Sequence, residues 1–161
     1  MTSSASESHN GAGVAVPPPL VFLGLLAVGV LADRLVTGWS VDLPGLSRYT
    51  LAVVLGAAGF FFLAGAIRLF RRAGTRPEPW KPTTAIVTTG IYGVTRNPMY
   101  VGMAFIHAAL AIAFASPSAL VLLLVALLII RYAVIAKEER YLEASFGAEY
   151  LAYKSRVRRW I

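Results

Sequence analysis

The chain contains no cysteine, and His9 and His107 are its two histidines. The absence of cysteine excludes disulfide bonds, thiolate catalysis and a metal held by thiolates. With two histidines so far apart in the sequence, we expect no histidine-rich metal site and no bound metal. Charged residues are also scarce, at 14% of 161 residues, whereas 57% are hydrophobic. A soluble domain of this size is far more polar, so the composition indicates a membrane protein.

The charged residues that are present are mostly basic, which gives a formal net charge of +7. A basic chain often binds nucleic acid, but here the basic residues stand at the ends of apolar runs. In those places they interact with lipid headgroups and orient a membrane protein. We therefore expect membrane lipids, and no nucleic acid, as partners. The sequence does not indicate an oligomeric state.

The apolar runs predict an all-α, polytopic membrane protein with four transmembrane helices. A polar tail, 1–16, has the composition of a disordered segment and precedes two transmembrane helices within 17–70. Residues 71–98 are expected to form a cytoplasmic loop, residues 99–136 a tight transmembrane hairpin, and residues 137–161 an amphipathic cytoplasmic segment.

The distribution of basic residues predicts the topology. The second apolar run, 51–70, is followed by a cluster of arginines, which places this end in the cytoplasm by the positive-inside rule. The two later runs, 99–115 and 119–136, are separated by three residues, so we expect a tight turn between antiparallel helices. Four crossings return the chain to its starting side. We therefore expect both termini in the cytoplasm, at the inner membrane of a prokaryote.

The first candidate site is the segment 90–102, which is polar, contains Gly and Pro, and ends where the third apolar run begins. Arg96 carries a planar fork of donors that suits a carboxylate or a phosphate. Pro98 suits the first turn of a helix. Gly102 leaves backbone uncovered, so that a flat ligand or a neighbouring helix can approach closely. An ordinary start of a membrane helix, with interfacial Arg and Tyr, has the same pattern, and both interpretations stay open.

The second candidate site is the end of the fourth apolar run. Arg131 and Glu138 are seven residues apart, which is two helical turns, so we expect both to point into the same cavity. A charge within an apolar run costs roughly 2.5–3.5 kcal/mol and usually faces a partner or a water-filled space. The alternative is that Arg131 extends along the apolar surface to the membrane interface.

The end of the chain predicts two helical pieces separated at Gly147. In the second piece Tyr150, Tyr153, Val157 and Trp160 recur at helical spacing opposite a basic face. Such a helix lies in the plane of the membrane interface. It is expected either to close over the hairpin as a lid or to serve as a lipid anchor alone.

These motifs occur together in a recognisable order. Residues 90–102 read Gly-Ile-Tyr-Gly-Val-Thr-Arg-Asn-Pro-Met-Tyr-Val-Gly, and after two apolar runs come Glu138, Glu139, Leu142, Phe146, Gly147, Tyr150 and Tyr153. From about residue 75 to its end, the chain resembles the carboxy-terminal half of the isoprenylcysteine carboxyl methyltransferase and phospholipid methyltransferase superfamily. The resemblance implies an integral-membrane enzyme that binds S-adenosylmethionine at the cytoplasmic end of its last helices and releases S-adenosylhomocysteine.

The resemblance also implies which residues form the site. The residues expected to bind the cofactor are Tyr92, Arg96, Asn97, Pro98, Tyr100, Gly102, Glu138, Glu139, Tyr150 and Tyr153. Arg131 and Glu138 are the candidate catalytic residues, and Arg131 is expected to orient an anionic methyl acceptor. Members of the superfamily often carry Arg-His-Pro where this chain has Arg-Asn-Pro at residues 96–98. The amide of Asn97 can still bind the cofactor, but it lacks the ring nitrogen for a proton transfer.

The sequence does not identify the methyl acceptor. The resemblance favours an isoprenylcysteine carboxyl methyltransferase-like enzyme acting on a lipophilic acceptor, and a phospholipid amine or a small thiol are the alternatives. From another class, the protein could be a catalytically silent membrane scaffold or a transporter. A transporter is expected to show repeated halves, which the sequence lacks. A silent scaffold would have no reason to retain cofactor binding.

Overall fold

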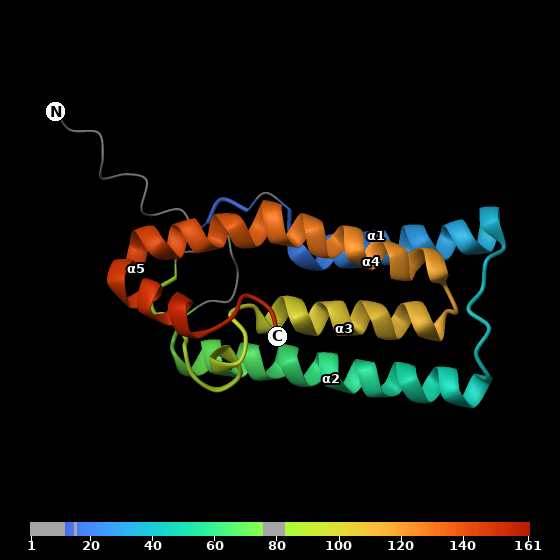
Figure 1. The fold of residues 1–161 in the computed structure, drawn as a ribbon, viewed down its shortest axis with the longest axis horizontal. Helices are drawn as coiled ribbons and strands as arrows, with labels where there is room; N and C mark the ends of the chain where they lie inside the picture. The colour runs from blue at the N-terminus through green and yellow to red at the C-terminus, as the bar shows by residue number, and fades with distance from the viewer. Residues whose placement is uncertain (1–11, 15, 76–82) are drawn as a thin grey trace.

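A computed structural model describes residues 12–14, 16–75 and 83–161. Within these ranges the regular structure is helical and contains no strand, which confirms the all-α expectation. Four helices run side by side and alternate in direction (Figure 1). They are α1 (Pro18–Ala32), α2 (Gly45–Arg72), α3 (Pro98–Ala113) and α4 (Pro117–Ile129). Most of the predicted disordered tail, 1–16, lies outside the described residues.

Two of these helices continue beyond their α-helical part. α1 is extended by a π-helical turn, η2 (Asp33–Thr37), and α4 by η4 (Ile130–Ile135), which leads directly into α5 (Ala136–Arg156). Gly147 within α5 has φ 51° and ψ −122°, so the predicted break at this residue is confirmed. After the break α5 turns back over the end of the bundle (Figure 1).

Three helical stretches among the described residues are long and apolar enough to cross a membrane: Pro18–Thr37, Gly45–Arg72 and Pro117–Arg156. α3 is apolar too, but its 16 residues fall short of the roughly 20 that a full crossing takes. α2 begins at Gly45, six residues before the apolar run at 51, and its first helical turns are therefore more polar than the rest of the helix. The outward faces of the helices expose large apolar side chains, as expected in lipid.

Glycines set the distance between neighbouring helices. A Cβ on Gly102 in α3 would lie 2.8 Å from the carbonyl oxygen of Gly59 in α2, and 3.0 Å from the backbone nitrogen of Leu63. A Cβ on Gly29 of α1 would lie even closer to the backbone of Ala119 in α4. Small residues permit such close contact between membrane helices. Of the two interpretations of Gly102, the structure therefore shows close approach of a helix.

The α3–α4 turn forms a tight hairpin, as predicted, and it is attached to α1 through a buried aspartate. The carboxylate of Asp33 accepts hydrogen bonds from the backbone N–H of Ser118 at 3.0 Å and from the hydroxyl of Thr37 at 3.0 Å. The hydroxyls of Ser116 and Ser118 also donate to it. We call Asp33, Thr37, Ser116 and Ser118 the far-end clasp. It holds the hairpin turn to α1 at the end of the bundle opposite α5 (Figure 1).

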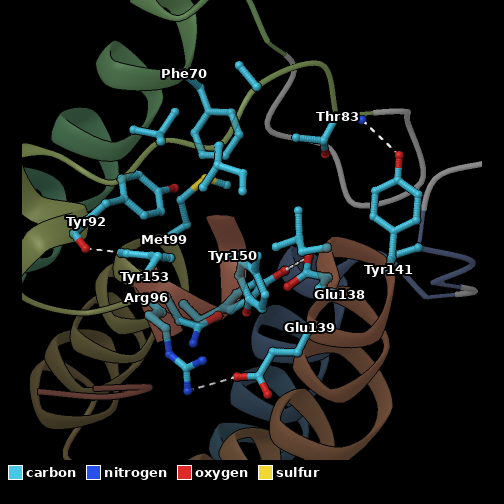
Figure 2. A pocket seen from close by; sticks show the side chains of 17 residues that line it. Phe70, Thr83, Tyr92, Arg96, Met99, Glu138, Glu139, Tyr141, Tyr150 and Tyr153 are labelled. Atoms are coloured by element: carbon cyan, nitrogen blue, oxygen red, sulfur yellow. Dashed lines mark hydrogen bonds and ion pairs between the residues drawn. The ribbon is translucent and has the colours of Figure 1, made fainter. Parts of the chain in front are cut away.

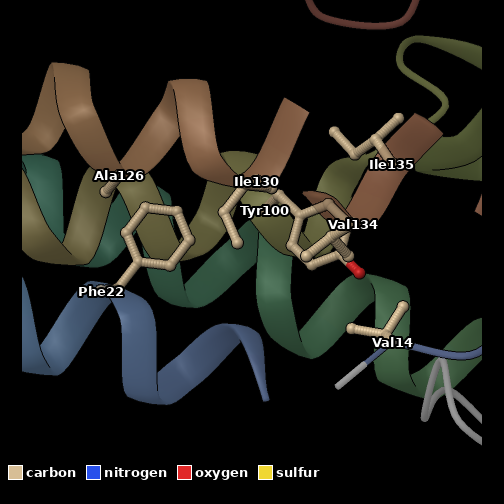
Figure 3. Packing of buried hydrophobic residues seen from close by; sticks show 7 residues of the cluster. All are labelled: Val14, Phe22, Tyr100, Ala126, Ile130, Val134 and Ile135. Atoms are coloured by element: carbon tan, nitrogen blue, oxygen red, sulfur yellow. The ribbon is translucent and has the colours of Figure 1, made fainter. Parts of the chain in front are cut away.

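The apolar core lies between α1, α3 and the α4–η4 helix (Figure 3). Its buried members are Val14, Phe22, Tyr100, Ala126, Ile130, Val134 and Ile135. The ring of Tyr100 packs inside this cluster, and its hydroxyl points out of it toward the α5 end of the bundle. The core thereby fixes one polar group at the place where α3 begins.

Candidate functional site

A cavity opens at the end of the bundle where the loop before α3 meets α5 (Figure 2). The space free of atoms within it and in its open mouth, solvent included, amounts to about 830 Å³. Its wall consists of Ala12, Phe70, Thr83, Ala85, Ile86, Val87, Tyr92, Arg96, Asn97, Met99, Tyr100, Glu138, Glu139, Tyr141, Leu142, Tyr150 and Tyr153. Aromatic side chains thus surround a small number of charged groups, as in many small-molecule sites.

A short 3₁₀ helix, η3 (Gly90–Gly93), places Tyr92 in the wall. Gly90 opens this turn with φ 60°, a conformation that glycine adopts without strain. The Tyr92 ring packs edge-on against Phe70, with ring centroids 5.4 Å apart, and its carbonyl accepts a 2.7 Å hydrogen bond from the Tyr153 hydroxyl. Burial, followed by the nearby Tyr153 and Glu138, raises the pKa of Tyr92 well above its usual range. Its hydroxyl therefore stays protonated and can donate.

Arg96 is the buried cation of the cavity. Its side chain is 9% exposed, and its Nη2 lies 3.2 Å from Oε1 of Glu139. Its Nε and Nη1 atoms are buried and make no hydrogen bond with the described residues, although the hydroxyl of Tyr150 lies close to the guanidinium. Buried N–H groups are nearly always paired, and an unpaired one costs free energy. Two donors of a guanidinium in the wall of a cavity therefore suit an anionic ligand group.

Glu138 lies across the cavity from this cation. Its Oε1 accepts a 2.6 Å hydrogen bond from the hydroxyl of Tyr100, whose ring is held in the core. Figure 2 shows Glu138 among the side chains that line the cavity. The cavity thus presents the guanidinium of Arg96 and the carboxyl group of Glu138, each fixed by a neighbouring side chain.

Glu139, the next residue, is bound on both sides by arginines. Arg159 donates to it through both arms of its fork, with Nε 2.9 Å from Oε1 and Nη2 2.7 Å from Oε2. Arg96 contacts the same carboxylate. Arg159 did not emerge from the sequence as a site residue, because its only visible signal was membership of a basic tail.

Arg159 belongs to a non-helical segment, residues 157–161, which we call the strap. The backbone carbonyl of Arg158 accepts from the backbone N–H of Arg96 at 2.9 Å. The carbonyl of Arg159 accepts from the hydroxyl of Thr95 at 3.1 Å and from Nδ2 of Asn97 at 2.9 Å. Asn97 lines the cavity, but its side-chain amide is used to attach the strap.

The predicted aromatic stripe of Tyr150, Tyr153, Val157 and Trp160 is wrong in its second half, which lies in the strap. α5 ends at Arg156, and Val157 is extended, with φ −117° and ψ 133°. Trp160 therefore does not continue the helical face of Tyr150 and Tyr153, because the backbone there pairs with residues 95–97 instead of with itself. Tyr150 and Tyr153 are buried and form part of the cavity wall.

Arg131 lies outside the cavity, and the prediction that it shares a cavity with Glu138 is wrong. The reason is η4, because a π-helical turn contains more residues than an α-helical turn and changes which residues share a face. The Arg131 guanidinium stands over the ring of Tyr132, 5.4 Å from its centroid. It borders a separate apolar groove, lined also by Leu55, Val101, Ala104, Phe105, Ala108, Leu123, Leu127, Leu128, Trp160 and Ile161.

The structure therefore brings together most of the residues that were expected to bind a cofactor. Those in the cavity wall are Tyr92, Arg96, Asn97, Tyr100, Glu138, Glu139, Tyr150 and Tyr153. Pro98 and Gly102 are absent from this wall. Pro98 is buried at the first position of α3, where it starts the helix, and Gly102 packs against α2.

Comparison with known proteins covers the same part of the chain. The sequence profile of the phospholipid methyltransferase family matches residues 47–149, more than half of the 161 residues. An uncharacterized protein of Haemophilus influenzae is 54% identical over 35 residues, which are 22% of this chain and 56% of that protein. The match thus spans little more than half the length of this curated relative. No solved structure matches the chain.

Proposed function

Because the chain belongs to the phospholipid methyltransferase family, we propose that it transfers a methyl group from S-adenosylmethionine to a lipophilic acceptor at the membrane. The family and the three apolar helical stretches make it an integral-membrane protein of a methyltransferase family. The observation that supports the finer proposal most strongly is Arg96, which is buried in a cavity with two unpaired donors.

The cavity suits the polar groups of this cofactor. Its methionine part carries a carboxylate and an ammonium, and Arg96 and Glu138 supply the opposite charges in one cavity. Glu138 could equally bind a ribose hydroxyl. The rings of Tyr150 and Tyr153 offer apolar surface for the adenine. We assign Arg96 to the carboxylate, Glu138 to the ammonium or ribose, and the two tyrosines to the adenine.

The chemistry requires little beyond orientation. When bound, the cofactor would supply a methyl group on a positively charged sulfur. An acceptor can attack the methyl carbon in line with the carbon–sulfur bond, and the sulfur leaves as a thioether. The residues of the chain then have two tasks, to align the acceptor and to exclude water. Glu138, held by Tyr100, provides a carboxyl group that is fixed in the cavity. The aromatic wall keeps water away from the reacting groups.

The apolar groove beside Arg131 supports a lipophilic acceptor that enters from the bilayer between helices. Apart from Arg131, its lining side chains are apolar, and the arginine can orient an anionic group. A prenylcysteine carboxylate and a phospholipid both join an anionic group to long apolar chains, so both fit this groove. Membership of the family is compatible with a phospholipid amine as the methyl acceptor and equally with a prenylcysteine carboxylate. A small thiol uses none of these features.

Calorimetric titration tests this proposal directly. The detergent-purified protein is titrated with S-adenosylmethionine and with S-adenosylhomocysteine, and we expect about one site per chain. Arg96→Gln should weaken binding by more than about tenfold, since charged hydrogen bonds to the ligand are lost. Arg140→Gln is the matched control, because Arg140 is exposed on α5 and lies outside the cavity.

A negative result would favour a different class of protein. If the folded, unchanged protein bound neither ligand, in detergent and in lipid nanodiscs, the methyltransferase proposal would fail and the silent scaffold would replace it. If it binds, transfer of a labelled methyl group to prenylcysteine, phospholipid and thiol acceptors identifies the substrate.

A further inference from the structure

The strap crosses the cavity end of the bundle, and its side chains are directed to two different places. Arg159 forms a two-armed ion pair with Glu139, whereas Trp160 packs against the apolar core and borders the groove. Its backbone is attached to residues 95–97 through three hydrogen bonds. The strap lies beyond residue 149, where the match to the family ends. Its role therefore has to be argued from its contacts.

The charges around Glu139 explain why Arg96 keeps free donors. Arg159 occupies both carboxylate oxygens, so Arg96 contributes only Nη2 to the same carboxylate. Two guanidinium groups share one carboxylate, and the group of three keeps one positive charge. Nε and Nη1 of Arg96 remain unpaired as a result.

Removal of Arg159 would change this balance. An arginine and a carboxylate prefer a two-armed pairing, so Glu139 would then be free to pair with both arms of Arg96. That pair would be neutral, and it would draw donors of Arg96 away from the cavity. An anionic ligand would meet less positive charge and fewer unpaired donors.

We propose that Arg159 is a positioning residue: by occupying Glu139, it keeps Arg96 available to an anionic group bound in the cavity. Arg159 acts through its neighbour and does not touch the ligand. The strap is the means of attachment, since Thr95 and Asn97 hold its backbone in place. This inference rests on the proposed function, which supplies the ligand with its carboxylate.

The test compares two ligands that differ in the carboxylate. S-adenosylhomocysteine carries the amino-carboxylate, whereas 5′-methylthioadenosine has the same adenosine and thioether without it. We titrate both into the full-length protein and into Arg159→Gln. Affinity for S-adenosylhomocysteine should fall by about tenfold, and affinity for 5′-methylthioadenosine should change by less than about twofold, because it makes no use of Arg96.

Two further variants provide the controls. Arg158→Gln alters the neighbouring residue of the strap, whose side chain is exposed, and should leave both affinities unchanged. Arg159→Lys keeps a positive charge beside Glu139 but not the two-armed pairing, so it should recover part of the lost affinity for S-adenosylhomocysteine. Size-exclusion profiles and thermal unfolding show that each variant is folded.

The outcomes separate this inference from the proposed function. If Arg159→Gln lowered the affinities for both ligands equally, the role of the strap would be limited to supporting the shape of the cavity, and the inference would be overturned. Unchanged affinity for S-adenosylhomocysteine, or loss that Arg159→Lys does not recover, would overturn it as well. If the unchanged protein did not bind S-adenosylhomocysteine at all, the proposed function would fail first and the inference with it.

Discussion

The two ends of the helical bundle both bury ionic groups, but they pair them differently. At the far-end clasp, the carboxylate of Asp33 is 4% exposed and accepts hydrogen bonds from Thr37, Ser116 and Ser118, all of them supplied by the chain. At the cavity, two donors of Arg96 are buried and have no partner among the described residues.

This difference separates a structural role from a binding role. A buried ionic group whose hydrogen bonds are all made within the chain stabilises one arrangement of helices, and nothing is left for a ligand. A buried group with unpaired donors lowers stability until a ligand supplies the missing partner. Substitution at the clasp should therefore affect folding, whereas substitution at the cavity should affect binding.

Asp33→Ala is expected to have the largest effect, and the effect should be on stability. It leaves the buried hydroxyl of Ser116 and the half-buried donors of Ser118 without their acceptor. A buried unpaired donor costs about 1–3 kcal/mol, so the loss is on the order of 3 kcal/mol. Thermal unfolding in detergent measures it. Asp33→Asn, which keeps the size and one acceptor, should lose less. Weaker binding of S-adenosylhomocysteine by folded Asp33→Ala would contradict the division between the two ends.

Glu138→Gln should give the opposite result, with weaker binding in a protein of unchanged stability. The amide oxygen can still accept from Tyr100, so the local fold is kept, but a neutral amide replaces the carboxyl group that would bind the ammonium or ribose of the ligand. We expect affinity for S-adenosylhomocysteine to fall by up to about tenfold, as for one charged hydrogen bond. Glu143→Gln is the control, since Glu143 pairs with Lys154 at the surface of the same helix. Equal affinity in both variants would move the ligand away from Glu138.

The sequence predicted the cavity well where its residues fall in short, contiguous motifs. Arg96, Asn97 and Tyr100 lie within five residues at the start of a helix, and Glu138 and Glu139 are neighbours on another. Because a tight turn joins α3 to α4, the start of α3 and the end of the helix that continues α4 had to lie at the same end of the bundle. The all-helical fold followed from the apolar runs alone, since backbone groups in lipid must be paired within a helix.

The contacts that the sequence did not predict join residues far apart, or depend on a change in helical geometry. Arg159 is 20 residues from Glu139 and lies beyond the end of α5, outside any helix, so no periodicity links them. Asp33 is 83 residues from Ser116, and the pairing depends on how α1 packs on the hairpin. Arg131 was placed on the wrong face because an apolar sequence gives no sign of the π-helical turn that carries it.

Substitution of Arg131 tests a third region, the apolar groove. It shows whether a change there affects stability, as at the clasp, or cofactor binding, as at the cavity. Arg131 is exposed and borders the groove, outside the cavity, so Arg131→Leu should leave affinity for S-adenosylhomocysteine unchanged. Turnover of an anionic lipophilic acceptor should fall by about fivefold, because an exposed ion pair contributes up to about 1 kcal/mol. Steady-state rates at saturating cofactor measure this, with Arg131→Lys as the charge-preserving control. Equal losses in turnover and in cofactor affinity would show that Arg131 does not orient the acceptor and that the groove is coupled to the cavity.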